Sequence, residues 1–385
     1  MKTRIIYCLI LCGFFTNTLQ SQEFVEKITE FFEFNIGKER EDPTFKQSKF
    51  VFAPIVAYEP STNWGFGVGA KFLFKPFGAG ADTRTSNMPL SVKYTLNNQF
   101  LATSDYTIFF PHENYLLKGK IGFAKFPISY FGIGSDTQDT NKREISFNNF
   151  IIEPLLLKKI SDGFFVGGGW RYNTYNSVDE ILDDENDVRI SIDDEYGTTS
   201  SGFEFALTFD TRNNVLNASE GIFSEFTHGF YDKALGSTQN FMLTKFDFRK
   251  YWQFSERRPD DSFAFQTYGR FSWNETPILE LSSLGGAELL RGYQEDRFRD
   301  RHAFFTQAEY RWQALERIGF VFYTGAGNVA SKIEDMEFKN LKYSLGTGIR
   351  LKIVKSENLN IRVDYAVGLG STSDRNFYLG IAESF

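Results

Sequence analysis

The segment Leu359-Asn-Ile-Arg-Val-Asp-Tyr-Ala-Val-Gly-Leu369 shows the pattern on which the predicted fold rests, because apolar residues alternate in it with polar or small ones. Every second residue, from Leu359 to Leu369, is apolar, and the residues between them are Asn, Arg, Asp, Ala and Gly. A period of two is that of a β-strand, whose successive side chains point to opposite faces. Its length also suits a tilted strand that crosses a bilayer. The stretch therefore predicts a strand with one oily face and one small or charged face.

The same alternation recurs from residue 49 onward and predicts sixteen strands. In a soluble sandwich the oily faces would point to a core. Three features indicate that the apolar faces contact lipid instead. The strands are longer than the globular mean of about five or six residues, glycine is frequent on the polar faces, and aromatic residues lie near strand ends. The expected strands are 49–59, 64–76, 88–97, 100–110, 114–124, 145–157, 163–176, 201–209, 221–232, 239–251, 261–274, 302–313, 317–326, 341–353, 357–369 and 374–385.

The linkers between these strands support an even count. The long ones at 125–144, 177–200, 275–301 and 327–340 all fall on one side, which we take as the outside, although 77–87 and 210–220 are exceptions. Because lipid offers no partner to an unpaired strand edge, the sheet must close on itself. The predicted fold is all-β: a closed antiparallel transmembrane β-barrel over 49–385, with both mature termini in the periplasm.

The start of the chain predicts export from the cytosol. Residues 1–21 have a basic beginning, an apolar run and a small residue at Ser21, the anatomy of a signal peptide. Cleavage removes Cys8 and Cys12, so the mature chain has no cysteine and no thiol chemistry. A lipoprotein reading of Cys12 is disfavoured by Leu11, which stands where a small residue is wanted. Residues 22–48 predict a short periplasmic helix, with Phe24 to Phe32 at helical spacing, followed by a linker.

Composition excludes other classes of protein. Of the 385 residues, 17% are aromatic and 24% are charged, and the mean hydropathy is −0.32, which excludes a bundle of apolar transmembrane helices. The formal net charge is −7 without a basic stripe, so we expect no nucleic-acid partner. The three histidines fall in unrelated places, without metal-ligand spacing or the order of a catalytic triad. We therefore expect no enzyme activity, no metal and no cofactor.

One external linker is strongly acidic. Nine carboxylates lie between Asp179 and Glu195. Clustered oxygen ligands suit calcium, but the EF-hand spacing with its central glycine is absent. We interpret this linker as a solvated acidic loop, with calcium binding left open.

The linker 275–301 carries the most specific pattern, Leu284-Gly-Gly-Ala-Glu-Leu-Leu-Arg-Gly-Tyr293. It resembles the loop signature of the BamA/TamA-like outer-membrane assembly barrels, the bacterial surface antigen superfamily. Segments beginning at Asp210, Gln307, Gly325 and Ser344 resemble that family in the same order, over about 49–385. The matching loop residues are Gly285, Gly286, Arg291, Gly292 and Tyr293; those of the periplasmic turn are Asp210, Arg212 and Gly221; and Phe385 resembles the C-terminal insertion signal.

The resemblance implies that this loop folds into the lumen and that acids on inward faces hold its arginine. A buried guanidinium requires such acceptors, because it is always charged and offers five donors. Carried over, Arg291 should meet Glu309. The family's second acid falls at Gly325 here, so we expect Asp364 or another lumen acid to substitute. Glu383 also departs from the family, whose last strand usually has an apolar residue there.

The resemblance further implies insertion or translocation of proteins, or of lipids, at the outer membrane without covalent chemistry. Its route is a weak seam between the first and last strands, here 49–59 and 374–385, which opens and pairs with incoming strands. The expected partners are outer-membrane lipids and possible client outer-membrane proteins or envelope assembly subunits. The short stretch before residue 49 leaves no room for the family's periplasmic repeats, which weakens this expectation. The alternatives are a passive solute channel and an accessory anchor barrel.

Overall fold

The structure is a computed structural model that describes most of the chain beyond the expected leader. The described residues are 33–36, 48–59, 63–96, 98–181, 197–255, 258–354, 358–370 and 374–385. The expected signal peptide, the expected helix over Phe24 to Phe32 and residues 182–196 of the acidic linker therefore lie outside the described residues. Among the residues described, no helix is long and apolar enough to cross a membrane.

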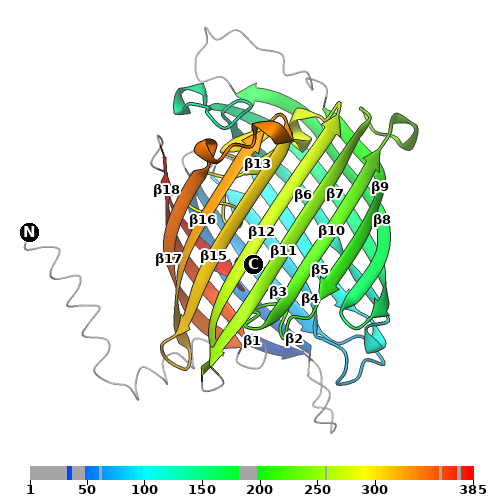
Figure 1. The fold of residues 1–385 in the computed structure, drawn as a ribbon, viewed down its shortest axis with the longest axis vertical. Coiled ribbons are helices and arrows are strands. Elements are labelled where there is room, and N and C mark those ends of the chain that lie inside the picture. Colours follow the sequence, from blue (N-terminus) through cyan, green and yellow to red (C-terminus); the bar gives the residue numbers. More distant parts are fainter. Residues whose placement is uncertain are drawn as a thin grey trace, which may run out of the picture.

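Sixteen long strands form one antiparallel sheet, as the alternation predicts, and each strand pairs with the next along the chain (Figure 1). Their polar and apolar residues alternate at the period of the pleat, which fixes the face that each side chain takes. The strands are β2 (Ser48–Glu59), β3 (Asn63–Phe74), β4 (Ser86–Thr95), β5 (Phe100–Phe109), β6 (Tyr115–Tyr130), β7 (Arg143–Ser161), β8 (Phe164–Ile181), β9 (Thr198–Asp210), β10 (Gly221–Tyr231), β11 (Phe241–Ser255), β12 (Arg258–Asn274), β15 (His302–Gln313), β16 (Ile318–Ala330), β17 (Lys342–Val354), β18 (Leu359–Leu369) and β19 (Arg375–Ile381).

Three short strands were not predicted. β1 (Glu33–Ile36) lies in the expected linker of residues 22–48 and pairs antiparallel with the start of β2, Glu33 opposite Val51 and Ile36 opposite Ser48. β13 (Ser282–Leu284) and β14 (Phe298–Asp300) form a small hairpin-like sheet within the 275–301 linker. These strands have only three or four residues, too few to show a period in the sequence.

Several predicted boundaries are wrong, and two of them show the reason. β6 continues to Tyr130, well into the expected 125–144 linker, where Lys125 to Tyr130 pair with Asn148 to Arg143 of β7. The ladder continues because the run Phe-Pro-Ile-Ser-Tyr still alternates, and its proline did not end the strand. At the chain end, β19 stops at Ile381 rather than running to Phe385. Ala382 has a φ of +76°, which ends the extended backbone.

The sheet is inverted relative to a soluble protein, because its polar face is buried and its apolar face is exposed. In β18, Arg362 and Asp364 are buried, whereas Val363 between them is 45% exposed. In β17, Ile349 is 52% exposed beside a buried Arg350. The sheet curls around an interior (Figure 1), and we take its buried polar face as the inner one. The inner face therefore holds the charged groups from which a functional site is built.

The two ends of the series of long strands, β2 and β19, lie next to one another in the strand order. Consecutive strands from β2 to β19 pair residue by residue, and β19 is in turn a hydrogen-bonded neighbour of β2. β19 is also short, with seven residues against twelve in β2. We call this junction the β2/β19 seam.

Candidate functional site

The linker between β12 and β15, residues 275–301, contacts buried polar residues of the sheet. Two of its glycines are required by the backbone. Gly285 has a φ of +124°, and a Cβ there would lie 2.1 Å from the carbonyl oxygen of Gln294. Gly292 has a φ of +112°, and a Cβ there would lie 2.6 Å from the carbonyl carbon of Val367 in β18. Glycine is therefore the residue that allows this close approach of the loop to the wall.

Arg291 is a deeply buried cation of the loop, with 1% of its surface exposed. Its Nη1 donates to Asp364 Oδ2 at 3.2 Å, and its Nη2 donates to Gln307 Oε1 at 3.1 Å and to Glu309. The guanidinium also lies 3.5 Å from the centre of the Tyr323 ring. The structure thus brings Arg291 together with Glu309 and Asp364, the two acids named from the sequence. We call this group the Arg291 clamp.

Each acid of the Arg291 clamp also holds arginines of the wall. Glu309 Oε2 accepts from Nε and Nη2 of Arg311, both at 3.0 Å. Asp364 accepts from Arg350 at 2.5 Å and from Arg362 at 3.2 Å. These wall arginines were not anticipated, although their inward register follows from the alternation of β15, β17 and β18. The two carboxylates therefore serve several cations, and displacing one cation changes the field at the others.

The rest of the motif attaches the loop to strands near the seam. The Gly292 N–H donates to Tyr378 Oη at 2.9 Å, and Asn376 Nδ2 donates to the Gly292 oxygen at 2.8 Å. Tyr293 Oη donates to the carbonyl oxygen of Tyr343 at 3.0 Å. Burial, reinforced by nearby Asp374, raises the pKa of Tyr293 to about 12, so its hydroxyl stays a donor at neutral pH. The loop is thereby tied to β17 and β19.

A second charged contact holds the beginning of the loop and was missed from the sequence. Glu280, in the 3₁₀ turn Ile278–Glu280, is 1% exposed. Arg171 in β8 donates to both of its carboxylate oxygens at 3.0 Å, and Asn173 donates to Oε1 at 2.7 Å. Arg270 in β12 donates to the carboxylate at 3.3 Å and to the main-chain oxygen of Glu280 at 2.7 Å. We call this group the Glu280 anchor.

The charges of the Glu280 anchor outweigh the cost of burial. Burial alone raises the pKa of a carboxyl group, but Arg171 and Arg270 hold that of Glu280 at about 2. The polarity is opposite to that of the Arg291 clamp, since here the loop supplies the acid and the wall supplies the bases. The only sequence signal was one acid within the apolar run Pro277-Ile-Leu-Glu-Leu281.

The end of the loop also contacts the linker of residues 131–142, between β6 and β7. Arg297 is 1% exposed, stacks 4.3 Å from the Phe131 ring centre, and donates to Thr137 Oγ1 at 2.6 Å and Asp139 at 3.0 Å. The Gly134 N–H donates to the carbonyl oxygen of Arg299 at 2.8 Å. The 131–142 linker therefore braces the 275–301 loop from outside the Arg291 clamp.

The turn motif expected on the periplasmic side is compact. Arg212 donates to both carboxylate oxygens of Asp210 at 2.9 Å, and Arg84 lies 3.0 Å from the same carboxylate. Gly221 has a φ of +108°, and a Cβ there would lie 2.4 Å from the oxygen of Thr211. The structure brings Asp210 and Arg212 together, and Gly221 closes the turn at the start of β10.

Phe385 lies beyond β19 and points inward. It is 7% exposed and forms a cluster with Ala218, Tyr251 and Ala264. Arg311 Nη2 donates to its main-chain oxygen at 2.9 Å. Its role as an insertion signal stays a prediction.

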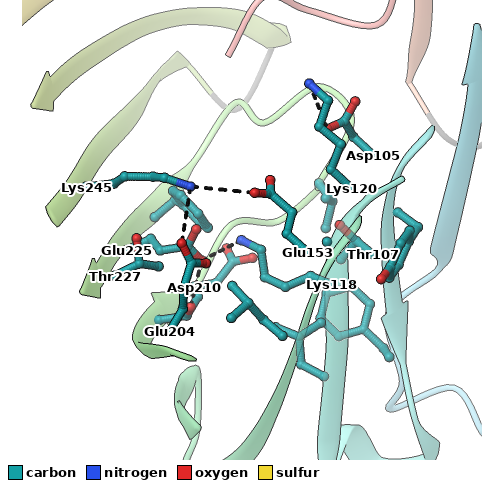
Figure 2. A pocket seen from close by; sticks show the side chains of 18 of the residues that line it. Asp105, Thr107, Lys118, Lys120, Glu153, Glu204, Asp210, Glu225, Thr227 and Lys245 are labelled. Carbon is teal, nitrogen blue, oxygen red and sulfur yellow. Dashed lines mark hydrogen bonds and ion pairs between the residues drawn. The ribbon is translucent and has the colours of Figure 1, made fainter. Parts of the chain in front are cut away.

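A polar cavity of about 390 Å³ is lined by residues of β5, β6, β7, β9, β10 and β11 and of the turn before β10 (Figure 2). Three of its ion pairs are loose, since Lys245 Nζ lies 3.9 Å from Glu153 and 3.8 Å from Glu204, and Lys120 Nζ lies 3.9 Å from Asp105. Two others are hydrogen-bonded, Lys118 to Glu225 and Arg212 to Asp210. The separations of the loose pairs exceed hydrogen-bond lengths, and the volume holds several water molecules. The part of the chain that the structure describes contains no group of three metal-type ligands. The cavity can therefore hold water or charged groups.

The model of the Omp85 superfamily domain matches residues 144–385. The solved structure of BamA from Haemophilus ducreyi lacking POTRA domains 1–3 aligns with a TM-score of 0.53 at 11% identity, covering 95% of this chain and 78% of that chain. CdiB from Acinetobacter baumannii aligns with a TM-score of 0.55 at 12% identity, covering 86% of this chain and 59% of that chain.

At these identities the two structures show a shared fold and nothing about activity, and this chain spans less than two thirds of the length of CdiB. No match was found among curated proteins. The family model, in contrast, covers well over half of the chain and includes the loop, the clamp and the turn that precedes β10. The chain belongs to the Omp85 superfamily.

Proposed function

We propose that this chain is an integral outer-membrane barrel that inserts or translocates polypeptides without a covalent step. The Arg291 clamp is the observation that carries the proposal. A buried loop arginine that is held by acids on β15 and β18 fixes the 275–301 loop across the interior beside the seam. A loop fixed across the interior would obstruct the flow of solutes through a passive pore. In an assembly barrel the same loop provides a fixed inner surface next to an edge that opens.

The exposed apolar face supports a position in a membrane. Outward side chains of neighbouring strands, such as Phe322, Leu345 and Val363, are 45–50% exposed, and together they present a continuous oily surface. In water such a surface is a liability, but in a bilayer it is the expected lipid contact. Closure of the sheet through the seam is part of the proposal, since open edges are not tolerated in hydrocarbon.

The seam supplies the mechanism that we propose. Strands pair through main-chain hydrogen bonds, so an edge that loses its neighbour offers the same bonds to another chain. β19, with seven residues, is the shortest of the sixteen long strands, so few such bonds can join it to β2. A client strand would pair with the released edge of β2. Client outer-membrane proteins, and possible assembly subunits, are the partners that this route requires.

Replacement of Arg291 by Ala or Lys tests the proposal. Lysine keeps the charge but lacks the planar guanidinium that donates to several acceptors at once. Both variants should therefore lower the levels of client outer-membrane proteins in a strain that is depleted of the unaltered protein. Arg301→Ala is the matched control, because Arg301 lies in the same loop with an exposed side chain. Quantitative proteomics of outer membranes gives the readout. Normal client levels with Arg291→Ala, in a barrel that still folds, would contradict the proposal.

The runner-up is a passive channel for small solutes, and the polar cavity of Figure 2 favours it. Conductance in planar bilayers separates the two functions. Large, stable openings in the unaltered protein would support the channel, whereas a closed barrel that opens when Arg291 is replaced would support the plug. An accessory anchor barrel would be indicated if the protein co-purified with envelope proteins while client levels did not depend on it.

A further inference from the structure

A second cavity, of about 450 Å³, lies between the 131–142 linker and the 275–301 loop. Lys342 of β17 and Gly370 after β18 complete its lining. The volume is within the range of about 300–1,000 Å³ that small-molecule sites have. The lining includes no residue of the Arg291 clamp or of the Glu280 anchor, so those contacts do not account for the cavity. We call it the loop cavity.

Arg297 lines the loop cavity, and one edge of its guanidinium is only half used. Nη2 donates to Asp139 Oδ1 at 3.0 Å and to the carbonyl oxygen of Thr137 at 2.7 Å. Nε, on the same edge, is buried and donates to no acceptor among the described residues, which is costly. Arg212 shows the complete arrangement, because its Nε and Nη2 each donate to one oxygen of Asp210 at 2.9 Å. An oxyanion on this edge of Arg297 would take both donors in the same way.

The two cations of the loop cavity are buried, whereas the acids that pair with them are exposed. The side chain of Arg297 is 1% exposed and that of its partner Asp139 is 59% exposed. The side chain of Lys342 is 18% exposed, and its Nζ lies 3.3 Å from Asp136, whose side chain is 81% exposed. Ion pairs with an exposed partner contribute little, because water competes for the charges. An entering anion can therefore displace either aspartate into solvent while the cations stay in place.

The Phe298 ring keeps the two cations together without neutralising them. Its centre lies 4.9 Å from Arg297 Cζ and 5.4 Å from Lys342 Nζ, both within the range of cation–π contacts. A third acid of this region, Asp374, does not line the cavity, and its Oδ2 accepts from the Gln294 N–H at 3.3 Å. Positive charge therefore gathers at the loop cavity and is balanced there by side chains that can move away.

We propose that the loop cavity binds a phosphorylated ligand of the size of a sugar, whose phosphate takes the Nε–Nη2 edge of Arg297 in place of Asp139. A phosphate carries more negative charge than a carboxylate, which favours it beside two cations. The cavity is larger than a bare phosphate, and hydroxyl groups of a sugar suit its polar lining, which includes Ser135 and Thr137. The sugar phosphate is either the headgroup of a membrane glycolipid or a soluble molecule. The site does not rest on the proposed function.

Titration calorimetry on purified protein in detergent, with glucose 1-phosphate as the probe, tests the proposal. Arg297→Lys keeps the charge but loses the planar fork, so it should weaken binding about tenfold. Asp139→Asn removes the competing carboxylate and should tighten binding about threefold, a gain that a purely structural role of Asp139 would not give. Asp335→Asn is the matched control, because this exposed acid lies in the linker before β17 but does not line the cavity, so binding should not change.

Two simpler compounds separate the parts of the ligand. Glucose lacks the phosphate and inorganic phosphate lacks the ring, so each should bind about tenfold more weakly than the probe. Equal binding of either compound, absence of probe binding, or unchanged binding by Asp139→Asn would overturn the proposal, and this last variant decides even if Arg297→Lys does not fold.

Nanodiscs of phosphatidylcholine with or without lipid A, a phosphorylated glycolipid, distinguish the two sources of the sugar phosphate. Weaker binding of the soluble probe in the presence of lipid A would support the site and identify a lipid headgroup as its ligand. Equal binding in both nanodiscs would support the site and identify a soluble ligand. Because these measurements involve no client protein, a failure to bind the probe would leave the proposed function standing.

Discussion

Glu280→Gln removes one negative charge from the Glu280 anchor while keeping the size of the side chain. The lost charge lies between Arg171 and Arg270, and Asn173 donates to it as well. Arg171 keeps a second acid, since its Nε donates to Glu153 at 3.0 Å. The variant therefore isolates the contribution of a buried carboxylate to holding the loop, without leaving Arg171 wholly unpaired.

The size of the effect follows from the pKa of Glu280, which falls from 4.5 to about 2 in the folded protein. At about 1.4 kcal/mol for each pKa unit, the ionised carboxylate adds about 3 kcal/mol to the free energy of unfolding. Because the folded pKa is depressed, this stabilisation is complete above pH 4.5 and is lost as the pH falls towards 2. The gap between the unaltered protein and the variant should shrink to about 1.4 kcal/mol at pH 3.

Urea unfolding in lipid vesicles, followed by tryptophan fluorescence at pH 7.5 and pH 3, measures this gap. Glu337→Gln is the control, because Glu337 pairs with Lys339 on an exposed turn and its loss should change stability by less than about 0.5 kcal/mol. A gap below about 1 kcal/mol at pH 7.5, or the same gap at both pH values, would refute the account of the anchor.

Three further predictions address the wall and the loop. Ile349→Arg, at an outward position, should cost about 2–4 kcal/mol in vesicles by the urea assay; a neutral result would argue against lipid contact. Gly292→Ala places a Cβ 2.6 Å from the backbone of β18 and should make the 275–301 loop sensitive to trypsin; unchanged digestion would contradict the close approach. Arg297→Ala should speed maleimide labelling of a cysteine placed at the exposed Thr140, and an unchanged rate would show that Arg297 does not brace this linker.

The sequence predicted the wall well because the wall obeys a local rule. A period of two reports the face of each residue, so the sixteen strands and the inward direction of Glu309 and Asp364 were available from the chain alone. The contact of Arg291 with these acids came from the resemblance to a family. The ends of β6, β7 and β19 were missed, because a strand ends where its partner ends or where a φ angle reverses, as at Ala382.

The interior contacts were harder to predict, because no local rule links residues across the sheet. Arg171 and Glu280 are 109 residues apart, and Arg291 and Asp364 are 73 apart. The inward position of Arg171 was predictable from β8, but its partner depends on the path of a loop without a repeating pattern. The same holds for Phe385, whose pocket combines a turn and two strands.

The pairing of β1 with β2 has a consequence for how the protein behaves before it meets any partner. The main chain of four residues at the start of β2, Ser48 to Val51, is already paired with β1 of the same chain. Unpaired strand edges expose main-chain N–H and C=O groups that can pair with other molecules and cause aggregation. A tethered cover re-forms quickly after each detachment, because its local concentration is set by a short connection rather than by diffusion. We therefore expect purified samples not to aggregate through this edge. An incoming strand that pairs with the start of β2 has to compete with the covalently attached β1.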